Sequence, residues 1–116
     1  MPAVGIWKNG GLRVDAELRD LYDAMIDVYR KAKSEVRGYT PTWYLDMVVS
    51  EGPVVTAERL ITSEVPASGY ARLFEAGRLD LTVEALIVEN ERFHRFFAPE
   101  VVEAARARLK QYRYKE

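Results

Sequence analysis

The chain has 116 residues and a net charge of −1, and its 48 % hydrophobic and 30 % charged residues suit one folded domain and exclude a disordered chain. It has no cysteine, which excludes disulfides, thiolate metal ligands and cysteine nucleophiles. No apolar run approaches the roughly 20 residues that span a bilayer, and the first residues lack a secretory signal pattern. We therefore expect a cytoplasmic protein that has no membrane partner.

The first fourteen residues are expected to form an N-terminal arm beside a single helical domain at residues 15–116. Asn9-Gly10 lies between short apolar stretches, a pattern typical of hairpin turns. The sequence thus predicts short extended structure in the arm, with Trp7 packed on the body.

A long first helix is predicted over residues 15–37. Asp15 suits an N-cap because its carboxylate accepts from unpaired backbone N–H groups, and Gly38 suits the position after the helix because glycine tolerates positive φ. Apolar residues recur at intervals of three and four, which indicates one buried face. This face comprises Leu18, Leu21, Tyr22, Met25, Tyr29, Ala32 and Val36.

Two helices are predicted next. Thr40-Pro41 favours a helix start, and the residues that follow are apolar around most of the circumference, which predicts a central helix. Gly52-Pro53 breaks the chain and begins a short helix over residues 53–62.

The apolar pattern is densest around a predicted elbow at Gly77. A helix over residues 69–76 precedes this turn, and a helix over residues 81–90 follows it, with Asp80 as the expected cap. Arg72 and Arg78 are expected to bind carbonyls or acids across the turn in preference to an external anion.

The last helix is predicted to begin at Pro99, after an ambiguous segment at residues 91–97. Its acidic start and basic end match the helix dipole. The predicted fold is therefore all-α: a compact bundle of about six helices, in which a long first helix and a basic last helix flank short central ones.

Five stretches, residues 38–45, 52–61, 68–88, 92–97 and 104–109, resemble a small helical module of uncharacterised bacterial proteins. The resemblance covers residues 38–112. The signature of the module reads Arg72-Leu73-Phe74-Glu75-x-Gly77-Arg78-Leu79-Asp80-Leu81-Thr82-Val83-Glu84-Ala85-Leu86. The resemblance implies a recurring bacterial building block without an assigned activity, and it implies no catalytic residues.

Few residues suggest catalysis. His94 is the only histidine, and a general base or metal ligand needs converging partners that its neighbours do not supply. Glu84, Glu89 and Glu91 could pair to bind a divalent cation, but their spacing better suits a solvated helix face. We expect no catalytic residue, cofactor or metal.

Charge is uneven along the chain. Residues 46–91 hold nine acids and three arginines, which argues against a DNA-reading helix there, because DNA binding needs cations. Residues 104–116 hold five bases and one acid, which suits nucleic-acid binding through the last helix as an alternative function. The candidate contacts are Arg106, Arg108, Lys110, Arg113 and Lys115.

The preferred hypothesis is a non-enzymatic helical module that mediates protein–protein contacts, either by self-association, as a homodimer for example, or as an accessory subunit of a bacterial system. It rests on more large aromatic residues than a small core needs, since interfaces are enriched in aromatics. The candidate interface residues are Trp7, Trp43, Tyr44, Phe93, Phe96 and Phe97.

Overall fold

The computed structural model describes the backbone of residues 4–64 and 68–115, and the side chains of residues 15–64 and 69–115. Every regular element in these residues is helical, which confirms the all-α prediction. In chain order the helices are α1 (Val4–Glu35), α2 (Thr42–Glu51), α3 (Pro53–Thr62), α4 (Ser68–Glu75), α5 (Val83–Glu89) and α6 (Pro99–Gln111), with short 3-10 helices η1 (Leu79–Leu81) and η2 (Glu91–Phe96).

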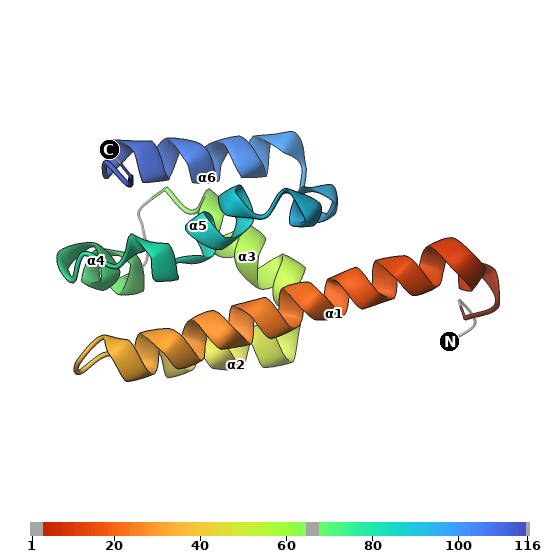
Figure 1. The fold of residues 1–116 in the computed structure, drawn as a ribbon, viewed down its shortest axis with the longest axis horizontal. Coiled ribbons are helices and arrows are strands. Elements are labelled where there is room, and N and C mark those ends of the chain that lie inside the picture. The colour runs from red at the N-terminus through yellow and green to blue at the C-terminus, as the bar shows by residue number, and fades with distance from the viewer. Residues whose placement is uncertain (1–3, 65–67, 116) are drawn as a thin grey trace.

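The helices lie in three levels (Figure 1). α1 and α2 run side by side along one edge, α6 lies along the opposite edge, and α3 and α5 fill the space between them. α4 lies near the end of the molecule that holds the C-terminus of α6. The longest dimension, 48 Å, matches the length of a 32-residue helix at about 1.5 Å per residue, so α1 sets the shape.

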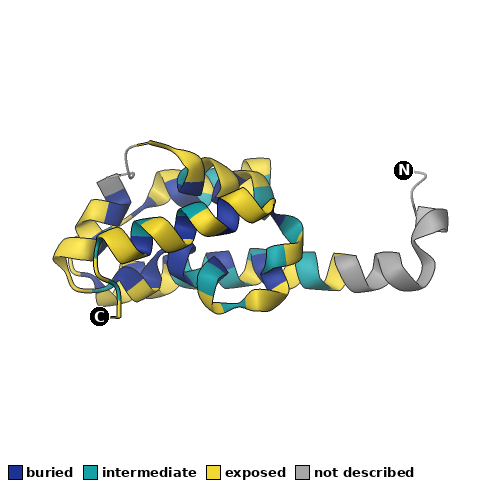
Figure 2. Cartoon of the chain, turned by 90° about the horizontal axis from the view of Figure 1, so that it is seen from above, coloured by how far each residue is buried: buried dark blue, intermediate teal, exposed yellow. Residues whose placement is uncertain are grey.

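Two groups of buried side chains form the core, and the buried positions face inward on every helix in Figure 2. The larger group joins α1, α2, α3, α5 and α6, and includes Phe93 of η2. The smaller group joins Ala32 of α1, and Val36 just after that helix, to Leu73 of α4 and Leu81 of η1. The predicted inner face of α1 is confirmed for Leu21, Met25, Tyr29, Ala32 and Val36, whereas Leu18 and Tyr22 stay partly exposed.

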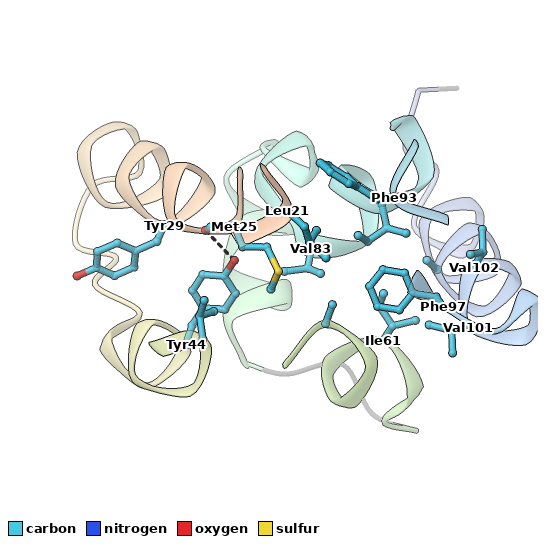
Figure 3. Close-up of a cluster of buried hydrophobic side chains, with 14 residues drawn as sticks. Leu21, Met25, Tyr29, Tyr44, Ile61, Val83, Phe93, Phe97, Val101 and Val102 are labelled. Atoms are coloured by element: carbon cyan, nitrogen blue, oxygen red, sulfur yellow. Dashed lines mark hydrogen bonds between the residues drawn. The ribbon is translucent and has the colours of Figure 1, made fainter. Parts of the chain in front are cut away.

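Three aromatic residues that the sequence assigned to a partner interface lie in this core. Phe93 and Phe97 are buried against α6, and the Tyr44 hydroxyl donates to the Met25 carbonyl oxygen at 2.8 Å (Figure 3). The interface prediction is therefore wrong for Tyr44, Phe93 and Phe97. The space between the short helices is too wide for small side chains, so these aromatic side chains fill it.

The extended arm is a second correction. Helix α1 begins at Val4, so residues 4–14 belong to the first helix and Asp15 lies inside it, where it cannot be an N-cap. An isolated two-stranded hairpin is marginal in water, whereas a helix that already exists lengthens without a new nucleus. That difference outweighs the cost, about 1 kcal/mol each, of placing Gly10 and Gly11 in a helix.

The breaks between helices follow the sequence closely. Gly38 and Gly77 adopt φ of 76° and 72°, which L-residues with a side chain avoid, and Pro53 and Pro99 begin helices. One cap differs from the prediction, because Thr82 and not Asp80 caps α5. A 3-10 turn at η1 shifts the start of α5 by two residues, and this frees Asp80 to pair with Arg78.

Across the two described backbone segments, every helix is too short or too polar to traverse a lipid bilayer.

Candidate functional site

A cavity of about 50 Å³ lies where the two core groups meet. Helices α1, α2 and α4 supply walls, and the η1–α5 junction closes it with Leu81, Thr82, Val83 and Glu84. Leu60 of α3 also lines it, and because close packing is the norm in protein interiors, a void at the junction of these elements is a candidate binding site.

The walls of this cavity are mainly aromatic. Tyr29 of α1 and Tyr44 of α2, which are both labelled in Figure 3, contribute two of the rings. The full set of aromatic residues that line it is Tyr29, Tyr39, Trp43, Tyr44 and Tyr70. Trp43 is 43 % exposed, so this part of the cavity wall is open to solvent.

Glu84 is the one charged group among the described residues that line the cavity. It is 4 % exposed, and its Oε2 accepts a hydrogen bond from Arg108 Nη1 of α6 at 3.0 Å. A buried carboxylate without a partner would be costly, so Arg108 is what allows Glu84 to stay charged at this depth.

Arg108 is itself held from several sides. Its guanidinium donates to the carbonyl oxygens of Leu60 and Ser63 at the end of α3, and its carbon Cζ lies 5.8 Å from the Tyr70 ring centroid. The Tyr70 hydroxyl donates in turn to the Arg108 carbonyl oxygen at 3.4 Å. These contacts connect α3, α4, α5 and α6 behind the cavity.

Burial shifts the pKa values of the ionisable side chains around the cavity. Loss of hydration raises the pKa of Glu84, and the hydrogen bond and charge of Arg108 oppose that rise. Burial also raises the pKa of Tyr44 and of Tyr70, and the negative charge of Glu84 adds to both shifts. The tyrosines therefore remain neutral hydroxyls near pH 7.

Gly69 permits the close approach of α4 to Tyr39 in the loop between α1 and α2. The Tyr39 hydroxyl lies so near the Gly69 backbone that a Cβ at position 69 would collide with it. Burial raises the pKa of Tyr39, while Arg72 lowers it. Gly69 therefore fixes the place of the Tyr39 ring in the cavity wall.

The solvated face expected for the three glutamates is wrong for Glu84 and holds for Glu89 and Glu91, which are exposed. Glu89 accepts from the Tyr114 hydroxyl at 2.8 Å and pairs with Lys115 at 2.7 Å. The burial of Glu84 depends on Arg108, which lies 24 residues later, and no sequence spacing indicates that pairing.

His94 packs at the end of α5, where a ring nitrogen lies 2.8 Å from the Ile87 carbonyl oxygen. This placement fits a helix-end histidine. Within the described side chains, no group of three or more histidine, aspartate or glutamate residues is arranged to hold a metal ion.

The basic residues of α6 do not form one free cationic surface. Arg108 is buried against Glu84, Arg106 pairs with Glu103, and Lys115 pairs with Glu89. Lys110 and Arg113 are exposed. The prediction of nucleic-acid contact is therefore wrong for Arg108, whose side chain is only 10 % exposed.

The arginines near Gly77 behave as predicted. Arg72 donates to the Arg37 carbonyl oxygen at 2.9 Å, and Arg78 pairs with both Glu35 and Asp80. Hydrogen bonds from Arg78 lower the pKa of Asp80. These contacts tie the turn to the C-terminal end of α1.

A second feature is a surface groove along α1 made of two adjoining hollows that share Tyr22 and Asp23. The first is lined by Leu18 of α1 and Pro53 of α3, and the second by Ile26 of α1 with Leu45 and Val49 of α2. Charged residues of α1 line both hollows beside these apolar side chains. Val49 is 61 % exposed, the most exposed of the large apolar side chains. We call this feature the α1–α2 groove.

The remaining candidate interface residues divide between surface and core. Trp43 is at the surface beside the cavity, and Phe96 is partly exposed and packs against the larger core group. Trp7 lies in the part of α1 outside the described side chains.

Comparison with protein-family models, with curated proteins and with solved structures finds no match to this chain. The resemblance to a bacterial helical module thus gains no support from these comparisons, and function must be argued from the geometry.

Proposed function

We propose that this protein is a protein–protein interaction module that self-associates through the α1–α2 groove. The observation that carries the proposal is the charge and apolar pattern of α1 along this groove, which complements itself. An antiparallel pairing of two α1 helices satisfies this pattern without any change of conformation.

The apolar part of the pattern is symmetric about Tyr22. Leu18 and Ile26 lie four residues before and after it, and all three line the groove. In a two-fold arrangement the same patch contacts itself, so Tyr22 meets its copy and Leu18 meets the second copy's Ile26. Leu45 and Val49 of α2 would then flank the contact and exclude water from it.

The charges of α1 are centred one residue later than the apolar residues. Arg19 and Asp27 lie four residues before and after Asp23, and both line the groove. Antiparallel pairing therefore places Arg19 opposite the second copy's Asp27, and Asp15 near the second copy's Arg30. A two-fold axis makes each of these attractive pairs twice, which favours this register over a parallel one.

Charge reversal tests this register directly. Multi-angle light scattering of the wild-type chain at micromolar concentration should give twice the mass of 13.3 kDa. Arg19→Asp and Asp27→Arg should each weaken the dimer by about tenfold or more, because each places like charges opposite one another twice. The double variant Arg19→Asp/Asp27→Arg restores opposite charges and should recover the dimer.

Two exposed valines provide a matched control for the apolar part. Val49→Glu should dissociate the dimer, whereas Val55→Glu, at a 43 % exposed position outside the groove, should leave it intact. A strictly monomeric wild-type chain, or a dimer that both single reversals leave unchanged, would overturn the proposal.

The other partners considered from the sequence have less support. Nucleic-acid binding through α6 draws on five basic residues, and three of these are engaged by Glu84, Glu89 and Glu103. A role as an accessory subunit uses the same groove with a different helix as its occupant. It becomes the preferred alternative if the isolated chain is monomeric.

A further inference from the structure

The aromatic and charged side chains that line the cavity between the two core groups favour a positively charged ligand over a negatively charged one. Five aromatic rings line it, and the only charged lining residue among those described is Glu84. None of these lining residues is cationic. Aromatic faces carry partial negative charge, so the rings and the carboxylate attract the same kind of ligand.

From this arrangement we propose that the cavity is a binding site for a small organic cation of the methylated-ammonium class. The inference is independent of self-association, because the cavity and the α1–α2 groove share no lining residue.

Arg108 does not cancel the attraction for a cation. It does not line the cavity, and its donors point to Glu84 and to the Leu60 and Ser63 carbonyl oxygens. A ligand in the cavity is therefore nearer to the carboxylate than to the guanidinium. Because Coulomb energy falls with distance, the nearer negative charge dominates.

The apolar walls select the kind of cation. A metal ion or bare ammonium ion needs several oxygen ligands to replace its hydration shell, and the cavity offers one carboxylate and a few hydroxyls, of which the Tyr44 hydroxyl already donates to Met25. A methylated ammonium is weakly hydrated and makes its contacts through methyl groups. Aromatic cages recognise such groups through cation–π attraction.

The size of the cavity fits the same class. A volume of 50 Å³ corresponds to about four water-sized positions, at 10–15 Å³ for each. This space suits a group of roughly five non-hydrogen atoms, such as tetramethylammonium or the head of a longer methylated amine whose tail leaves past Trp43.

The test uses two probes of one shape. The full chain, labelled with ¹⁵N, is titrated with tetramethylammonium chloride and with tert-butanol, which has a similar tetrahedral shape and no charge. Sodium chloride at the same concentrations controls for ionic strength. Tetramethylammonium should produce saturating shifts of the Gly69, Thr82 and Glu84 amides, with an apparent affinity at least tenfold above that of tert-butanol.

Substitutions then locate the site. Trp43→Leu removes a wall ring and should weaken binding at least fivefold, whereas Phe74→Leu, at a similarly exposed aromatic outside the cavity, should have no effect. Ala32→Leu fills the cavity and should abolish the shifts while circular dichroism confirms the fold. If that variant does not fold, the comparison of Trp43→Leu with Phe74→Leu shows whether the cation binds in the cavity.

Each result separates the proposal from its alternatives. Equal affinity for tert-butanol would show an apolar cavity without charge preference and would overturn the inference. Shifts that persist unchanged in Trp43→Leu would place the cation elsewhere, and the absence of saturation would exclude a site.

Discussion

At the scale of single residues, Glu84 and Arg108 form the only ion pair in the described part of the chain in which both side chains are almost wholly buried. Most other pairs, such as Lys31 with Asp27, are largely exposed and contribute little to stability. A buried pair behaves differently, because removing one partner leaves the other charged in a medium that solvates it poorly.

We expect Arg108→Met to lower the free energy of unfolding by about 3–5 kcal/mol, because it leaves Glu84 unpaired and removes two hydrogen bonds to α3. Glu84→Gln/Arg108→Met should lose less, since no charge then remains buried. Urea unfolding followed by circular dichroism at pH 7 measures both. A loss of under about 1 kcal/mol for the single variant would show that the pair is solvated.

The pKa of Glu84 predicts a pH dependence. Burial raises this pKa above its ordinary value of 4.5, so the folded chain binds the proton more tightly than the unfolded chain. The resulting stabilisation is complete below pH 4.5 and is lost as the pH rises through the folded pKa.

Relative to Glu84→Gln, which cannot titrate, the wild-type free energy of unfolding should therefore fall as the pH rises from about 4.5 through the folded pKa of Glu84. Urea titrations of both proteins across that range measure the difference. The opposite slope would mean that Arg108 outweighs burial and holds the folded pKa below 4.5.

At the scale of the element, the junction between η1 and α5 depends on Thr82. Its Oγ1 accepts from the Ala85 N–H at 3.1 Å and donates to the Leu79 carbonyl oxygen at 2.7 Å, so one buried hydroxyl ends η1 and begins α5. This junction also positions Glu84 in the first turn of α5, where the dipole favours a carboxylate.

Thr82→Val keeps the shape and removes both hydrogen bonds, so we expect a loss of about 1–3 kcal/mol in the free energy of unfolding. Thr82→Ser keeps the cap and should lose less than Thr82→Val. Thermal and urea unfolding compare the two. Equal losses would show that the methyl group matters as much as the cap at this position.

Helix α1 shows that packing on the core can outweigh the preference of individual residues for a turn. The glycines that favour a turn on their own lie inside a 32-residue helix, because the segment from Leu18 onward packs on the core and serves as its nucleus.

At the scale of the whole molecule, the α1–α2 groove leaves most of Val49 uncovered, together with the outer parts of apolar side chains that pack against the core. In the proposed dimer, the charges of Asp15, Arg19, Asp27 and Arg30 set the register, while the apolar floor supplies most of the affinity. These two contributions respond differently to salt.

We therefore expect the dimer to weaken by roughly three- to tenfold between about 50 and 500 mM sodium chloride without dissociating completely, since salt screens charges and spares apolar burial. Analytical ultracentrifugation measures the dissociation constant in each buffer. The double variant Arg19→Asp/Asp27→Arg should show the same dependence. Strengthening with salt would indicate an interface made by apolar contacts alone.

The sequence by itself determined the helical class, most helix boundaries and the inner face of α1. These features depend on local rules: apolar spacing of three and four, proline at the first turn, and glycine at positive φ near Gly38 and Gly77. They require no knowledge of which helices are neighbours.

Which polar and aromatic side chains are buried depends on the tertiary structure. Glu84 meets Arg108 across 24 residues, Tyr44 reaches Met25 across 19, and five aromatic residues converge on one cavity from α1, α2, α4 and the loop before α2. The energy of a buried charge or ring depends on what surrounds it in space, and helix packing brings those surroundings together from distant parts of the chain.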